Sequence, residues 1–193
     1  MNKAVFIDKD GTLIPDIPHN TNPELVDLYA GAVSGLKALK NAGFLLIVIT
    51  NQSGIARGYF SHEQFALVRG KIEELLSNAG IELDGFLHCP HDPEGNVMRY
   101  AVDCECRTPT PGMLIQAAEQ WHISLSSSWM IGDILNDIEA GKRAGCKAVL
   151  INNGGETEWI SGMFREPDFT APDIEQAAEY ILKNEYEREL GGL

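Results

Sequence analysis

Basic residues are scarce in this chain. It has 15 Lys and Arg residues against 28 Asp and Glu residues, a formal net charge of -13 over 193 residues. Such a charge repels the phosphate backbone of nucleic acids and anionic membrane surfaces at long range. We therefore expect neither a nucleic acid nor a membrane as a partner. A small anionic ligand remains compatible with the sequence, because backbone amides, a metal ion or one or two arginines can outweigh the overall charge locally.

Long apolar runs are absent as well. The sequence has no stretch of 18 apolar residues, and its first residues lack the charged-then-apolar order of a signal peptide. Internal repeats, low-complexity segments and linkers are not found either. With 44% hydrophobic residues, the chain has enough apolar material for one well-buried core. We expect a single domain spanning residues 1–193, monomeric and cytoplasmic.

Short apolar segments alternate with segments of helical periodicity. Strands are predicted at 4–8, 44–50, 83–89, 127–133, 147–154 and 168–171, and helices at 25–43, 61–79, 112–121, 137–145 and 173–187. The apolar strands lack polar alternation, which is typical of a parallel sheet covered by helices on both faces. The sequence thus predicts a doubly wound, mainly parallel α/β fold.

Three of the predicted strand ends carry polar side chains. They are residues 8–12 after the first strand, residues 50–54 after the second, and Asp133 with Asp137 after a later one. In open parallel sheets, ligands bind beyond the carboxyl ends of the strands. We expect these three segments to form one pocket.

Asp8 and Asp10 lie two residues apart where the first strand ends. This pairing favours phosphoryl transfer, in which one carboxylate attacks phosphorus and a second carboxyl group moves the proton. We predict Asp8 as the nucleophile that forms an aspartyl phosphate, and Asp10 as the general acid and base. Thr50 can donate its hydroxyl to a phosphoryl oxygen, and Asp133 supplies a further oxygen ligand for Mg²⁺.

Asp137 follows Asp133 by four residues, about one helical turn, and can orient the site from behind the metal ligands. The alternative interpretation is structural, since a D-x-D-G-T string is common in turns and aspartates at a strand end are often merely solvated. Three polar strand ends in the right order favour the catalytic interpretation, because a motif gains force from its predicted context.

Three of the four cysteines lie within 18 residues, which in a reducing compartment indicates a metal site rather than disulfides. Cys89, His91, Cys104 and Cys106 supply three thiolates and one imidazole. Four protein ligands complete the tetrahedral coordination of Zn²⁺, so we predict a structural zinc ion that holds the loop 89–106. The alternative is a set of free cysteines beside an unrelated histidine. Cys146 is predicted to be a core residue.

Several motifs resemble a known superfamily. FIDKDGTLI, VITNQSGIARG and MIGDILND are similar to the first, second and fourth motifs of the haloacid dehalogenase superfamily. TNQSGIARGYF, CPHDPEG and CECRTPTPGM resemble its subfamily of D-glycero-D-manno-heptose-1,7-bisphosphate phosphatases, of which the histidinol-phosphatase domain is a close relative. The similarity extends over residues 4–150.

The resemblance implies a Rossmann-like core without a large cap domain, and Mg²⁺-dependent hydrolysis of a sugar phosphate, foremost the C7 phosphate of the heptose bisphosphate. It implies that Mg²⁺ is held by Asp8, the backbone carbonyl of Asp10, and Asp133. It also implies contacts with a small phosphorylated substrate from the following residues: Asp16, His19, Asn51, Gln52, Ser53, Arg107 and Thr108.

The chain departs from this subfamily at two positions. The subfamily reads C-R-K-P where this chain has Thr108 after Arg107, and the lysine usual after the metal-binding aspartate is replaced by Ile134. A buried ammonium beside a phosphoryl transition state is worth orders of magnitude in rate. Arg107, or one of three other basic residues, is a candidate to replace the missing charge: Arg57, Lys142 and Arg143.

This departure leaves a second hypothesis open, a weak phosphatase or a non-catalytic sugar-phosphate binder. The retained Asp10 favours an active enzyme, because a binder needs only its main-chain carbonyl for the ion. A phosphatase acting on nucleic-acid ends would require a basic groove, which the net charge argues against.

Overall fold

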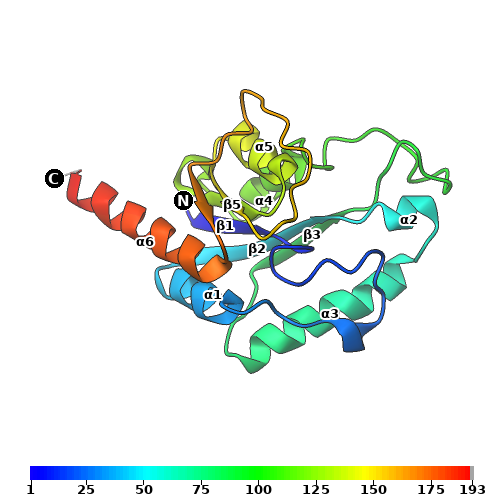
Figure 1. Ribbon diagram of the computed structural model, residues 1–193, viewed down its shortest axis with the longest axis horizontal. Helices are drawn as coiled ribbons and strands as arrows, with labels where there is room; N and C mark the ends of the chain where they lie inside the picture. Colours follow the sequence, from blue (N-terminus) through cyan, green and yellow to red (C-terminus); the bar gives the residue numbers. More distant parts are fainter. Residues whose placement is uncertain (192–193) are drawn as a thin grey trace.

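Six parallel strands form one central sheet in the computed structural model, which describes residues 1–191 (Figure 1). The strands are β1 (Lys3–Asp8), β2 (Phe44–Asn51), β3 (Gly85–Cys89), β4 (Trp129–Gly132), β5 (Lys147–Ile151) and β6 (Phe169–Ala171). Their order across the sheet is β3-β2-β1-β4-β5-β6, and every neighbouring pair is parallel. The predicted Rossmann-like α/β fold is confirmed.

Helices cover both faces of this sheet. One face carries α1 (Ala32–Asn41), α3 (His62–Asn78) and α6 (Ile174–Gly191), and the other carries α4 (Gly112–Gln120) and α5 (Leu135–Ala144) (Figure 1). Residues 4–7 of β1 have no exposed surface because they lie between these two layers. Burial on both faces explains why the strands are apolar throughout rather than alternating.

Several predicted boundaries were wrong, and two of them lie near the site. The helix expected from residue 25 begins at Ala32, and residues 23–25 form a short 3-10 turn, η1 (Pro23–Leu25), instead. Val26 is buried in the loop between them, so its apolar character resembled a helical core position. Gly31 then adopts a left-handed conformation, with φ of 83°, and starts the helix. Strand β4 begins at Trp129 rather than at residue 127, because Ser127 ends a 3-10 turn, η2 (Leu125–Ser127).

The site is positioned by the change of direction between β1 and β4. These strands are neighbours, yet the chain leaves β1 toward α1 on one face and leaves β4 toward α5 on the other. Such a switch opens a crevice at the carboxyl ends of the two strands. Within residues 1–191 the helices and strands include no separate cap domain. None of the described helices combines the length and apolar character needed to cross a membrane.

Candidate active site

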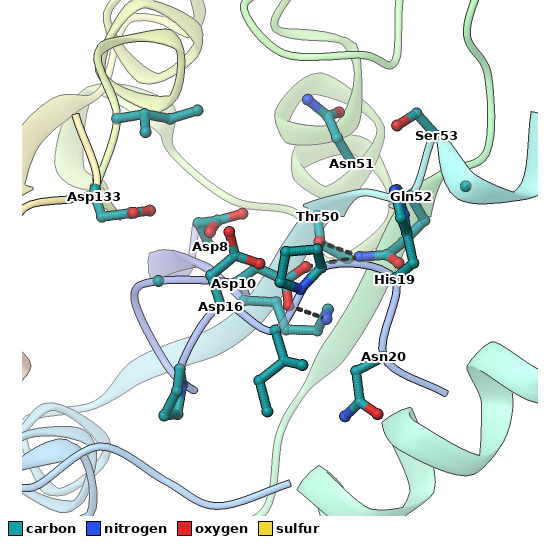
Figure 2. Close-up of a pocket in the computed structure, with 18 of the residues that line it drawn as sticks. Asp8, Asp10, Asp16, His19, Asn20, Thr50, Asn51, Gln52, Ser53 and Asp133 are labelled. Atoms are coloured by element: carbon teal, nitrogen blue, oxygen red, sulfur yellow. Dashed lines mark hydrogen bonds and ion pairs between the residues drawn. The ribbon is translucent and has the colours of Figure 1, made fainter. Parts of the chain in front are cut away.

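A cavity of about 500 Å³ lies at the carboxyl ends of β1, β2 and β4, bordered by the loop 15–20 (Figure 2). The three polar strand ends therefore meet, as the sequence predicted. Ten of the predicted site residues line this cavity: Asp8, Asp10, Asp16, His19, Thr50, Asn51, Gln52, Ser53, Asp133 and Asp137.

Three carboxylates at the base of the cavity form a cluster. Asp8 ends β1, Asp133 follows β4 and Asp137 lies in the first turn of α5, and one oxygen of each lies within 4.8 Å of the others. Oδ2 of Asp137 is buried and has no hydrogen-bond partner in the described part of the chain. Carboxylate oxygens are the ligands that Mg²⁺ prefers, so this cluster fits a magnesium ion.

Burial shapes the electrostatics of the cluster. It is the largest cause that raises the pKa of all three carboxyl groups, that of Asp133 to about 6 and those of Asp8 and Asp137 well above their usual range. Repulsion from neighbouring carboxylates raises the values for Asp8 and Asp137 further. The cluster therefore requires a cation if all three groups are to be ionised near neutral pH.

The turn after β1 holds Asp133 in place. Thr12 is buried and its hydroxyl donates to Oδ1 of Asp133 over 3.1 Å. Gly11 has φ of 83°, and a Cβ at this position would lie 2.1 Å from Oδ2 of Asp133. Asn153, in the loop after β5, donates its amide to the Gly11 carbonyl over 2.6 Å. Glycine at position 11 is thus required both by the backbone conformation and by the close approach of the carboxylate.

Asp10 is held on both of its carboxylate oxygens. Oδ1 forms an ion pair with Nζ of Lys9, and Oδ2 accepts a 3.0 Å hydrogen bond from the side-chain amide of Gln52. The same amide donates to the Thr50 hydroxyl oxygen over 3.0 Å, and Figure 2 marks both of these contacts of Gln52 with dashed lines. Because the Thr50 oxygen accepts from Gln52, its hydroxyl proton remains available to a phosphoryl oxygen.

Arg107 and Thr108 are not among the residues that line the cavity. The Arg107 guanidinium donates to the His91 carbonyl over 3.3 Å, inside its own loop. Thr108 is buried against the end of β2, where the Asn51 amide donates to its hydroxyl over 2.7 Å and the Asn51 side-chain oxygen accepts from its backbone N–H over 3.2 Å. Asn51 therefore fastens this loop to the sheet, and the predicted contacts of Arg107 and Thr108 with substrate have no support in this geometry.

The predicted zinc ligands converge. Sγ of Cys106 lies 2.9 Å from Sγ of Cys89, 3.2 Å from Sγ of Cys104 and 3.2 Å from Nδ1 of His91, and all three cysteines are free thiols. A tetrahedron with metal–sulfur bonds of about 2.3 Å has edges of about 3.8 Å, so the four groups, which lie closer together than this, are near enough to share one Zn²⁺ after moving slightly apart. Cys146 directly precedes β5 and is buried in the core, as predicted.

Comparison with known proteins agrees with this geometry. A protein 43% identical over 155 residues, 80% of this chain and 84% of its own, is the D-glycero-beta-D-manno-heptose-1,7-bisphosphate 7-phosphatase of Pasteurella multocida (strain Pm70). That of Escherichia coli (strain K12) is 35% identical over 181 residues, 94% of this chain and 88% of its own. The family model for HAD-hydrolase-like proteins matches residues 105–177. The chain belongs to the haloacid dehalogenase (HAD) phosphatases.

A solved HAD phosphatase shows the same fold with ligands. The D,D-heptose 1,7-bisphosphate phosphatase of B. bronchiseptica, complexed with magnesium and phosphate, has a TM-score of 0.76, with 26% identity over 94% of this chain and 99% of its own. HAD phosphatases hydrolyse phosphate monoesters and depend on Mg²⁺. The carboxylate cluster of this chain offers the oxygen ligands that such chemistry requires.

The three basic residues considered as replacements for the missing lysine of the HAD subfamily are engaged elsewhere. Arg57 pairs with Asp92, Lys142 with Asp168 and Arg143 with Glu139, at 2.6, 2.7 and 2.6 Å respectively. None of the three lines the cavity. The structure gives these three candidates no support, because each group pairs with a carboxylate outside the cavity.

Lys9 is the residue that sequence reasoning missed. Within residues 1–191 it is the only Lys or Arg side chain that lines the cavity, and its exposed fraction is 4%. Alternation along a strand would place Lys9 opposite Asp8 and Asp10, which explains why the pattern gave no signal. The strand ends at Asp8, however, and the chain turns there, so Lys9 can reach the same cavity as its two neighbours.

Proposed function

We propose that this protein hydrolyses the C7 phosphate ester of D-glycero-D-manno-heptose 1,7-bisphosphate in a Mg²⁺-dependent reaction. The observation that carries this proposal is the pair Asp8 and Asp10, in which Asp8 also belongs to the carboxylate cluster. Both residues line a cavity large enough for a phosphorylated sugar. The names of relatives that are 33% to 43% identical over most of the chain support the choice of substrate.

In the first step, an oxygen of Asp8 attacks the phosphorus and the bond from phosphorus to the ester oxygen breaks. Asp10 gives its carboxyl proton to the leaving alcohol. Thr50 donates its hydroxyl proton in a hydrogen bond to a phosphoryl oxygen, which is supported by its acceptance of the Gln52 amide.

In the second step, Asp10 accepts a proton from a water molecule, and the resulting hydroxide attacks the aspartyl phosphate on Asp8. The products are inorganic phosphate and the regenerated carboxylate. A bound Mg²⁺, held by Asp8, Asp133 and the main-chain carbonyl of Asp10, would offset the negative charge of the phosphoryl group. Asp137 lies next to these ligands and orients them without binding the ion itself.

The remainder of the substrate faces the loop 15–20 and the end of β2. Asp16, His19 and Ser53 line this side of the cavity and can contact sugar hydroxyls or the second phosphate. The His19 ring lies 4.5 Å, between centroids, from the ring of Tyr59, which supports the loop against α2 (Gly54–Arg57) and its following turn.

The zinc ligands have a structural role in this proposal. A site closed by Cys89, His91, Cys104 and Cys106 leaves no coordination position for substrate. The segment that it closes is tied to β2 by the hydrogen bonds between Asn51 and Thr108. Zinc therefore stabilises one wall of the cavity.

The test is a panel of phosphate esters with purified protein and Mg²⁺, comprising the heptose bisphosphate, histidinol phosphate and common sugar phosphates. We expect release of phosphate from the heptose bisphosphate, and its loss in Asp8→Asn and in Asp10→Asn variants that keep the native circular dichroism spectrum. A higher kcat/KM for histidinol phosphate than for the heptose bisphosphate would mean that histidinol phosphate is the substrate instead. Binding of esters without hydrolysis of any of them would make the protein a sugar-phosphate binder.

We further propose a cytoplasmic monomer in which residues 1–193 form one domain, with neither nucleic acid nor membrane as a partner. The net charge of -13 supports the exclusion of both polyanionic partners. Residues 192 and 193 lie outside the described part of the chain. Light scattering of the purified protein measures the oligomeric state. A mass of twice 21.2 kDa would contradict the proposed monomer and indicate a dimer.

A further inference from the structure

Lys9 has surroundings that the reaction described above does not explain. Its side chain is 5% exposed, its Nζ contacts Oδ1 of Asp10, and the same nitrogen lies 5.8 Å from the centre of the Phe65 ring. Burying an ammonium group costs free energy unless a carboxylate and other partners surround it. A lysine in this place is therefore not a solvated surface residue.

The two groups that hold Asp10 come from different elements. Lys9 belongs to the turn after β1, and Gln52 follows β2, where the exposed fraction of its side chain and backbone together is 7%. The side chain of Asp10 is itself 29% exposed toward the cavity. Two buried donors, one on each oxygen, fix both the rotation of the carboxyl group and the direction in which it faces.

The two oxygens of Asp10 differ in their surroundings. Oδ1 contacts the ammonium of Lys9, whereas Oδ2 contacts the Gln52 amide, which also donates to Thr50. Because Thr50 is the proposed phosphate ligand, Oδ2 is the oxygen on the phosphate side. Because the Lys9 ammonium occupies Oδ1, Oδ2 is the oxygen that remains directed toward the phosphate and its leaving group.

We propose that Lys9 is a positioning residue, which orients the Asp10 carboxyl group so that Oδ2 delivers the proton to the leaving alcohol. This inference rests on the proposed function, because it assigns a task within that reaction. In the step concerned, the Asp8–phosphorus bond forms, the ester bond breaks, and the proton moves from Oδ2 of Asp10 to the departing oxygen. Lys9 itself takes no part in the bonds that form and break.

The experiment compares two esters of similar size in saturating MgCl₂, phenyl phosphate and 4-nitrophenyl phosphate. Phenolate is strongly basic and needs a proton as it leaves, whereas nitrophenolate leaves readily without one. General acid catalysis contributes about 10² to 10⁴ in rate, so Lys9→Met should lower kcat/KM for phenyl phosphate by about 100-fold and for the nitrophenyl ester by less than about tenfold. Lys9→Arg, which keeps a charged donor, should largely restore the ratio between the two esters.

The matched control is Lys3→Met, the same substitution at the other end of β1. Lys3 does not line the cavity, and its ammonium pairs with Glu185 at a distance of 3.2 Å. This variant should hydrolyse both esters at the rate of the unmodified protein. If Lys9→Met does not fold, Lys9→Gln replaces it, since glutamine is shorter and neutral and cannot hold Oδ1 by charge.

The outcomes separate the two proposals. Absence of hydrolysis of both aryl esters and of the heptose bisphosphate by the unmodified protein would overturn the proposed function. The positioning role alone would be overturned by a different result, in which the unmodified protein hydrolyses the esters. In that result Lys9→Met lowers kcat/KM equally for both aryl esters, or lowers it for neither. In an Asp10→Asn background, Lys9→Met should cause no further loss on phenyl phosphate, because the two residues act through one proton transfer.

Discussion

Gly155 lies so close to Asp133 that a Cβ at position 155 would stand 2.0 Å from Oδ2 of that carboxylate. Gly155 belongs to the loop after β5, far from β4 in the chain, and it lines the cavity together with Asp133. Gly11 approaches the same oxygen, since a Cβ at position 11 would lie 2.1 Å from it, so this carboxylate has room only because both positions are glycine. Any side chain at position 155 must displace the proposed metal ligand.

We therefore predict that Gly155→Ala weakens Mg²⁺ binding by about tenfold or more, the size of effect seen when the support of a metal ligand is removed. The measurement is the Mg²⁺ concentration that gives half-maximal activity, with isothermal titration as a check. Gly70→Ala is the control, because Gly70 lies on α3 with open space around its Cβ position. An unchanged Mg²⁺ requirement in Gly155→Ala would show that Asp133 is not a ligand.

Stability should depend on pH in opposite ways with and without metal. Burial raises the pKa of Asp133 to about 6 from an ordinary value of 3.8, so the folded protein retains a proton that the unfolded chain has lost. Without Mg²⁺, the free energy of unfolding should fall as pH rises from about 4 to 6, by up to about 1.4 kcal/mol per pH unit for this one group. Asp8 and Asp137, whose pKa values are also raised, add to the same trend.

Bound Mg²⁺ favours the ionised carboxylates, so the same pH range should bring no loss, or a gain, in saturating MgCl₂. Urea unfolding at pH 5 and pH 7.5, in EDTA and in MgCl₂, measures both dependences. The variant Asp133→Asn should show a smaller difference between the two conditions. Parallel curves with and without Mg²⁺ would contradict a metal site at this cluster.

The grouping of the proposed catalytic carboxylates in one cavity could be predicted from the sequence, because strand ends and their polar residues are local features. Asp8, Asp10 and Asp133 follow apolar runs directly, and parallel strands bring such ends to one edge. The partners of long side chains could not be predicted in this way. Arg57 and Arg107 contact acceptors that do not line the cavity, whereas Lys9 contacts Asp10 inside it.

The limits of the fold prediction have a similar origin. The helix expected from residue 25 begins only after Gly31, since one buried loop residue, Val26, continued the apolar periodicity. This matters for the site, because the loop so formed carries Tyr29 to the cavity. Periodicity reports burial, and burial is not confined to regular elements.

The zinc cluster gives a prediction that is independent of catalysis. Elemental analysis of protein made with sufficient metal should find about one Zn per chain, and Cys104→Ser should lose it. Cys146→Ala should retain zinc, because that thiol lies in the core with burial raising its pKa to about 12. Protein that contains no zinc under these conditions would contradict the site.

Position 108 offers a direct test of positive charge next to the carboxylate cluster. Thr108 is 5% exposed, and its side chain opposes the rise in the pKa of Asp137, whose Oδ2 has no hydrogen-bond partner among residues 1–191. A lysine at this position could reach that carboxylate and place positive charge next to the cluster. We predict that Thr108→Lys raises kcat by about tenfold, less than the 10²–10³ cost of removing a preorganised donor from other enzymes, because the Asn51 hydrogen bonds to residue 108 are lost.

Thr108→Met is the control for this substitution, since methionine has a similar length without the charge. Steady-state kinetics on the best ester of the panel should separate the two variants, with a gain for lysine and none for methionine. Equal kcat in Thr108→Lys and the unmodified protein, or a fall, would mean that the site already has the positive charge it needs. Lys9 is the group in the cavity that would supply it, and in that case the effect of Lys9→Met should become smaller once lysine stands at position 108.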